Sequence, residues 1–184
     1  MELTTSKETI TNTSTIQIKK RDGRLEPLDI DKIHFVVEEA CEGLSGVSSS
    51  QIEINANIQF YDGMTTKEVQ QILVRSANDL ISLEAPNYQY AAARLLSYDV
   101  RKEAHGQYEY IPLLKLIMRN IRVGVYDKAI VEQFNKTEIK KMNTWIKRDR
   151  DLDFTYAGLR QVVDKYLVQD RSTGALYETP QDMY

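Results

Sequence analysis

The sequence predicts a mainly helical α+β fold, in which a small β-hairpin or sheet caps a four-helix bundle and a helical segment ending in a second hairpin follows. Ile16 and Ile18 alternate with polar residues before an Asp-Gly turn at 22–23, which is typical of a hairpin. Four stretches with apolar residues at helical spacing extend from there to Gly106. Further helical stretches lead to an alternating segment at 166–178.

The composition is that of an ordinary globular protein. The 184 residues are 42% hydrophobic and 28% charged, which suits one domain or two small ones with a buried core. The net charge of −3 creates no basic field, so we expect no nucleic-acid partner. No apolar run approaches the roughly 20 residues of a transmembrane helix, so we expect no membrane partner.

The amino-terminal residues and the single cysteine indicate the compartment. Residues 1–14 are rich in Ser and Thr and lack the apolar core of a signal peptide or an anchor. We therefore expect a disordered tail and a cytoplasmic protein. Cys41 has no second cysteine to pair with, and its helical spacing from Val37 and Leu44 favours a buried hydrophobe over a reactive thiol.

The first unit is predicted at 15–106, and each of its elements has a local signal. After the turn, Leu25 and Leu28 continue the return strand, which ends near Pro27. Each of the four helices then has a start signal, and two glycines mark ends. The start signals are Asp29 or Asp31, the capping-box spacings Ser50–Glu53 and Thr65–Glu68, and Pro86 in a first turn; the glycines are Gly43 and Gly106.

The second unit is predicted at 107–184 and is less complete. Pro112 begins one helix, Thr137 caps another that includes Ile146, and a third runs from 154 to 167. The terminal hairpin has no third strand or covering helix, and a hairpin of that kind is marginally stable. We therefore expect the chain to be the front part of a longer protein.

Four cations surround the first turn, namely Lys19, Lys20, Arg21 and Arg24. The glycine between them lets the backbone approach a phosphate closely. Lys20 could act as a point charge, and Arg21 could bind a phosphate through two parallel hydrogen bonds. The charge run by itself nevertheless favours a solvated hairpin tip.

Two later residues also have a structural and a functional interpretation. Thr66 lies in a predicted first helical turn, where it favours capping but could contact an anion at the helix N-terminus. Lys102 lies near a helix C-terminus, where a cation favours the helix dipole but could also meet a phosphate. If the fold brings Lys20 and Lys102 together, the chain binds a nucleotide.

Catalytic motifs are missing from the sequence. It contains no GxxxxGK[ST], no GxGxxG, no Ser-His-Asp pattern and no cysteine pair. The two histidines, His34 and His105, are too few and too far apart in sequence to indicate a metal site. Hydrolytic and redox chemistry within this chain are therefore not expected.

Three runs of sequence resemble an ATP cone: KKRDGRLEPLDIDKI, NIQFYDGMTTKEVQQILVRSANDLI and PNYQYAAARLLSYDVRK. They resemble in particular the cone at the front of the large subunit of class I ribonucleoside-diphosphate reductase. GQYEY and RDRDLDFTYAGLRQVVDKYLVQDRSTGALYETPQ are similar to the helical segment that follows the cone in that subunit. The resemblance spans about 16–181.

The resemblance implies allosteric regulation. In that family the cone is the overall-activity site, where ATP switches the reductase on and dATP often switches it off. It implies ATP or dATP, with Mg, as effector, and no redox cofactor in this chain. The implied partners are the remainder of the large subunit and a radical-generating small subunit, in an oligomeric assembly. Because the family's catalytic cysteines lie in a barrel beyond the matched part, we expect this chain alone to be inactive.

The resemblance also implies a set of site residues. Lys20 and Lys102 would hold phosphates, Thr66 would help at the phosphate or ribose side, and Ile18 and Ile33 would form apolar walls for adenine. The segment 26–32 would line the nucleoside. The full implied set is Ile18, Lys20, Arg21, Glu26, Pro27, Leu28, Asp29, Ile30, Asp31, Lys32, Ile33, Thr66 and Lys102.

Two departures from the family and two alternative functions remain open. Asp29 and Gln70 stand where some relatives carry Asn and His, which leaves the discrimination of dATP from ATP open. A cone-bearing transcriptional repressor would need a zinc ribbon or a basic DNA-reading element, and the sequence shows neither. A helical interaction module would leave the cationic hairpin solvated, and nucleotide titration distinguishes this possibility.

Overall fold

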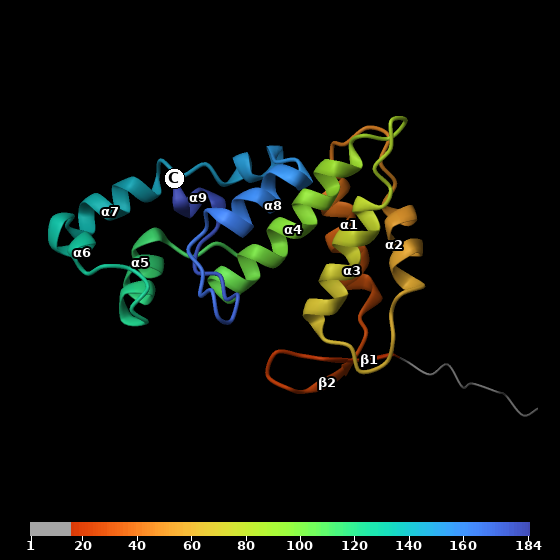
Figure 1. Cartoon of the computed structure of the whole chain (residues 1–184), viewed down its shortest axis with the longest axis horizontal. Coiled ribbons are helices and arrows are strands. Elements are labelled where there is room, and N and C mark those ends of the chain that lie inside the picture. Colours follow the sequence, from red (N-terminus) through yellow and green to blue (C-terminus); the bar gives the residue numbers. More distant parts are fainter. Residues whose placement is uncertain (1–15) are drawn as a thin grey trace, which may run out of the picture.

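A computed structural model describes residues 16–184 (Figure 1). The tail predicted at 1–14 lies outside the described residues. Helices dominate, and the strands within residues 16–184 form one two-stranded antiparallel sheet, so the predicted fold class is confirmed. None of the described helices has both the length and the apolar content that crossing a membrane requires.

The predicted first hairpin is present. Strands β1 (Gln17–Lys19) and β2 (Leu25–Pro27) pair antiparallel, and the N–H of Gly23 donates to the carbonyl of Lys20 across the turn at 2.9 Å. Gly23 has a φ of +86°, a left-handed conformation that glycine adopts without steric cost. Ile18 is the buried residue of the hairpin and joins the helical core.

The loop before α3 (Thr66–Asn78) continues the edge of the hairpin. The N–H of Lys19 donates to the carbonyl of Met64, and the N–H of Gly63 donates to the carbonyl of Gln17, each at 2.8 Å. These bonds place the first turn of α3 beside the end of β1. Two segments that carry candidate site residues are thereby joined through the backbone.

The first four helices form the predicted bundle. They are α1 (Ile30–Cys41), α2 (Ser49–Asn57), α3 and α4 (Tyr88–His105). Helix α4 packs on α1 and α3, and α2 packs on the other side of the same pair. The bundle is held by side chains that are almost completely buried, including Val37, Ile52, Met64, Leu73 and Leu95.

Several predicted helix ends are confirmed. Asp29 caps α1 by accepting from the N–H of Lys32 at 3.1 Å. Thr65 and Glu68 form the predicted capping box at the start of α3, in which each side chain accepts from the other's backbone. Gly106 ends α4 in the left-handed conformation, with a φ of +75°.

Other predicted starts are wrong by one or two residues. Helix α2 is capped by Ser48, whose hydroxyl accepts from the N–H of Gln51, and not by Ser50. Three consecutive serines could each cap this helix, and Ser48, whose backbone is extended, occupies the N-cap position. Pro86 lies in the turn before α4, and Asn87 occupies the cap position.

The second unit is a string of shorter helices, of which α8 lies against α4 (Figure 1). Leu159 and Val163 of α8 belong to the same buried cluster as the bundle, so α4 has helices on two sides. The division of the chain at Gly106 stays a proposal, because the core continues across it. The elements are α5 (Leu113–Arg122), α6 (Ala129–Gln133), α7 (Lys136–Asn143), the 3-10 helix η1 (Arg148–Asp153), α8 (Tyr156–Lys165) and α9 (Pro180–Met183).

One prediction for this unit is wrong in detail. Helix α7 is capped by Asn135, not Thr137, and it ends before Ile146. The expected terminal hairpin is reduced to one antiparallel bridge between Gln169 and Leu176, and α9 follows it. An alternating pattern also suits a loop whose apolar residues dock on a helix, which is how Leu176 reaches the core.

The capping box of α3 supports a stability prediction. Thr65→Ala removes the hydroxyl that accepts from the Glu68 N–H at 3.2 Å, so the free energy of unfolding should fall by about 1 kcal/mol. Urea unfolding followed by circular dichroism measures this change. Thr137→Ala in the exposed first turn of α7 is the control and should cost less than about 0.5 kcal/mol. Equal losses in both variants would contradict the role of the box.

Candidate functional site

A cavity of about 400 Å³ lies between the hairpin and helices α1, α3 and α4. Its size falls within the roughly 300–1,000 Å³ of small-molecule pockets. It combines an apolar wall with a group of polar and charged side chains. The apolar residues are Ile18, Leu28, Ile33, Phe35, Val36, Val69 and Leu73, and the others are Lys20, Asp29, Lys32, Thr66, Gln70, Lys102 and Tyr108.

The fold brings Lys20 and Lys102 to this one cavity from opposite ends of the bundle's sequence. The Nζ of Lys20 is 3.1 Å from a carboxylate oxygen of Glu26, and Lys20 remains only partly exposed. Burial lowers the pKa of Lys102, and the charges of Arg21 and Lys20 lower it further. Converging cations of this kind favour an anionic ligand, which would relieve their mutual repulsion.

Arg21 lies at a smaller cavity of about 80 Å³ beside the first. Its Nη1 donates to the carbonyl of Lys102 at 3.1 Å, which ties the hairpin tip to the end of α4. The two cavities share Thr66 and Lys102. The hairpin tip is therefore anchored over the site and is not only a solvated turn.

Thr66 is the first residue of α3, a helix of 13 residues. The cap of this helix is Thr65, so the side chain of Thr66 is not used for capping and lines both cavities. A helix N-terminus carries a partial positive charge and free N–H groups that suit phosphate. The capping interpretation of Thr66 is wrong, and the anion interpretation stays a prediction.

The cavity also has apolar lining residues. Ile18 and Ile33 are buried, whereas the ring of Phe35 is 62% exposed on α1. Asp29 and Lys32 stand beside this wall and form an ion pair of 2.8 Å. The hydrogen bond from Lys32 lowers the pKa of Asp29, so that carboxylate is ionised. An apolar wall facing a group of cations matches the two ends of a nucleotide.

Not every residue implied by the family resemblance lines the cavity. Eight of them do, and Arg21 lines the smaller neighbour. Glu26 lies outside and pairs with Lys20, while Pro27 ends β2, and the side chains of Ile30 and Asp31 are exposed. These four line neither cavity.

Sequence reasoning missed other lining residues. Val36, Val69 and Leu73 have the helical spacing of core residues, and that spacing does not distinguish a core position from a cavity wall on the same helix face. Gln70 was noticed as a departure from relatives, and its Nε2 donates to the carbonyl of Leu95 at 2.8 Å. Tyr108 follows the bundle, and no local signal could place it at the cavity.

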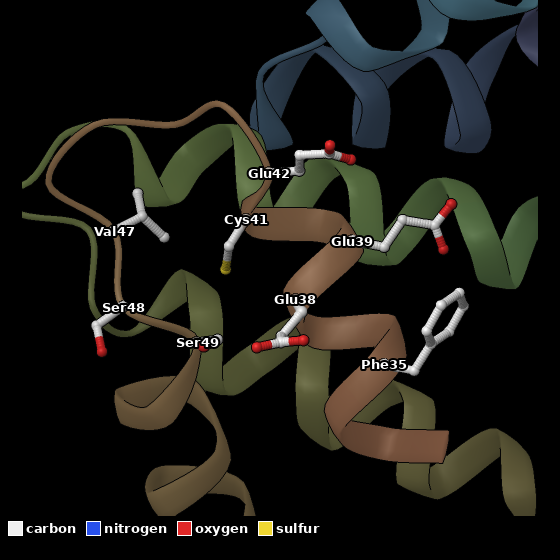
Figure 2. Close-up of a pocket in the computed structure, with 8 residues that line it drawn as sticks. All are labelled: Phe35, Glu38, Glu39, Cys41, Glu42, Val47, Ser48 and Ser49. Carbon is white, nitrogen blue, oxygen red and sulfur yellow. The ribbon is translucent and has the colours of Figure 1, made fainter. Parts of the chain in front are cut away.

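A wider hollow of about 770 Å³ lies against the C-terminal half of α1 (Figure 2). Three glutamates surround it, Glu38, Glu39 and Glu42, so its charge is wrong for a phosphate ligand. Cys41 also faces it, and burial raises the pKa of this thiol to about 11. A protonated, half-buried thiol agrees with the predicted unreactive cysteine.

Neither histidine forms part of a metal site. His34 lies between Glu38 and Glu53, and His105 pairs with Asp182. Within residues 16–184 no group of three His, Cys, Asp or Glu side chains is arranged to hold a metal ion.

Residues 16–103 match the model of the ATP cone domain, and this range contains the hairpin, both lysines and all of the bundle except the last two residues of α4. The first part of the chain is similar to an ATP cone domain. The cone resemblance predicted from the sequence is thereby confirmed.

Similar proteins extend the match beyond the cone. The chain is 45% identical over 167 residues to the ribonucleoside-diphosphate reductase 1 subunit alpha of Escherichia coli, covering 91% of this chain and 22% of the relative. It is 40% identical to the corresponding subunits of Haemophilus influenzae, over 169 residues, and of phage T4, over 168 residues. These matches cover 92% and 90% of this chain and 22% of each relative.

The chain thus spans about a fifth of the length of these relatives and is similar to their N-terminal region. The relatives are subunits of an oxidoreductase. The resemblance to the reductase large subunit is confirmed over the cone and the helical segment after it.

Proposed function

We propose that this chain is an allosteric nucleotide-binding region and that ATP and dATP bind in the cavity between the hairpin and helices α1, α3 and α4. The convergence of Lys20, Lys102 and Thr66 on one apolar-walled cavity carries the proposal. The phosphates would meet the cations and the N-terminus of α3, and the base would lie against Ile18 and Ile33. Magnesium would arrive with the phosphate oxygens of the effector.

The nucleotide would act as a signal and not as a substrate. In a reductase large subunit, binding here would control the overall reduction of ribonucleotides by shifting assembly with the rest of that subunit and a radical-generating subunit. A ligand shifts such an equilibrium only through different affinities for the two states. The alignment with a reductase alpha subunit covers 91% of this chain, and this coverage favours the regulatory role over that of a transcriptional repressor.

Thermal unfolding tests nucleotide binding. ATP or dATP at a hundred times its dissociation constant should stabilise the chain by about 2.7 kcal/mol, and adenosine at the same concentration should stabilise it far less because it lacks the phosphates. A chain that no nucleotide stabilises would instead support the helical interaction module. A chain that adenosine stabilises equally would contradict the role of the cations.

The lowered pKa of Lys102 predicts the pH dependence of nucleotide affinity. Lys102 binds phosphate in its charged form, so the nucleotide affinity is full at pH values below the lowered pKa. The affinity falls as the pH rises through that pKa, which lies below the ordinary value of 10.5. Lys102→Arg keeps its charge over the whole range. Titrations from about pH 7 to 10 should therefore show a fall in the wild type that the arginine variant lacks. The same fall in both proteins would contradict the assignment.

A further inference from the structure

Tyr108 lies outside the ATP cone but lines its cavity. The cone match ends at residue 103 and α4 ends at His105, so Tyr108 belongs to the connection that leads to α5. It lines both the larger and the smaller cavity. Thr66 and Lys102 are also shared by the two cavities, so Tyr108 stands beside both of them where the cavities adjoin.

The ring of Tyr108 is fixed from two helices of the bundle. Its hydroxyl donates to the carboxylate of Glu39 on α1. Its ring centroid is 5.5 Å from that of Tyr98 on α4, and the guanidinium carbon of Arg101 lies 4.5 Å from the ring. A cation over an aromatic face is attractive, so Arg101 holds the ring in place.

Arg101 holds a second residue of the same connection. Its guanidinium carbon is also 4.6 Å from the ring of Tyr110, which lies edge-on to His105 and has Arg148 on its ring at 4.5 Å. The connection at 107–111 is therefore fastened to α4, and Arg101 contacts both of its tyrosine rings. A ligand in contact with Tyr108 would contact this segment as well as the cone.

We propose that Tyr108 is a ligand-contacting residue of the nucleotide site and that Arg101 is the residue that positions it. The inference rests on the proposed nucleotide function and deepens it, because the effector site is then completed by the connection after the cone. The ring offers a flat face to the nucleoside at the junction of the two cavities, next to the phosphate-binding Lys102. Nucleotide binding would then restrict the motion of 107–111.

Calorimetric titration of the chain with dATP tests the contact. Tyr108→Ala should weaken binding about tenfold, and Tyr108→Phe, which keeps the ring, should stay within about threefold of the wild type. Tyr166→Ala is the control, because that tyrosine is 60% exposed at the end of α8 and should leave affinity unchanged.

A double-mutant cycle tests the positioning role of Arg101. Arg101→Gln should weaken binding in the wild type but cause no further loss in the Tyr108→Ala background, since it acts through that ring. Equal losses in both backgrounds would overturn the positioning role.

Hydrogen exchange on the wild type gives a readout that needs no variant to fold. Added dATP should slow exchange of the amides at 107–111. Wild-type affinity in Tyr108→Ala, or nucleotide binding without protection of 107–111, would overturn the inference while leaving the proposed function standing. Absence of any nucleotide binding by the wild type would overturn both.

Discussion

Replacing Asp182 with alanine is expected to lower the free energy of unfolding by about 3–5 kcal/mol, because it leaves the guanidinium of Arg148 and the buried side chain of His105 without their partner. The carboxylate of Asp182 is fully buried, and its oxygens lie 2.8 Å from Nε2 of His105 and 2.7 Å from Nη1 of Arg148. It also accepts from the N–H and hydroxyl of Thr179. This cluster joins α9 and η1 to the end of α4.

The pKa of Asp182 indicates that its buried carboxylate is ionised. Burial opposes ionisation, but the hydrogen bond from His105, the charge of Arg148 and the bonds from Thr179 outweigh it and lower the pKa from 3.8 to about 2. A lowered carboxylate pKa contributes stability above pH 3.8 that is lost as the pH falls towards 2. Asp182→Asn should remove this pH-dependent contribution to the free energy of unfolding.

Urea unfolding measures both effects. The control is Asp164→Ala, which removes an exposed carboxylate 3.0 Å from Arg160 on α8 and should cost less than about 1 kcal/mol. If Asp182→Ala costs no more than the control, the cluster does not hold the end of the chain to α4.

The second large effect is expected on nucleotide binding. Lys20→Ala and Lys102→Ala should each weaken the affinity for ATP by about 1.5–3 kcal/mol, the value of a charge-assisted hydrogen bond. Both side chains line the same cavity, so each should contribute to holding the phosphates there. Fluorescence or calorimetric titration measures the change.

Lys165→Ala is the matched control for these two variants. Lys165 lies exposed in the last turn of α8, away from the residues that line the cavity. Its removal should change affinity by less than about 0.5 kcal/mol. If all three variants bind alike, the phosphate site lies elsewhere.

Local sequence signals predicted the elements of the bundle well. Asp29, the capping box at Thr65 and the glycine turn at Gly23 act through bonds within a few residues, so their positions follow from the sequence. Where several cap residues compete, as at Ser48 and Ser50, local reasoning chose wrongly. The terminal alternating segment pairs through only one bridge, because an alternating pattern does not set how many residues of a hairpin pair.

The candidate site could be predicted only in part. In the sequence, Lys20 and Lys102 each had an adequate structural explanation. Only the family resemblance assigned the two lysines to one site, and the fold then placed both at one cavity. Phe35 and Tyr108 could not be found from the sequence, because a lining residue is defined by packing between distant segments. The bonds of Lys19 and Gly63 show how such distant segments are brought together.

One calorimetric experiment tests the central claim most directly. ATP is titrated into the wild-type chain and, under the same conditions, into the double variant Lys20→Ala/Lys102→Ala. The account predicts saturable binding to the wild type and an affinity lower by roughly a hundredfold or more in the double variant. Equal affinity in the two proteins, or no heat and no thermal stabilisation of the wild type, would contradict it.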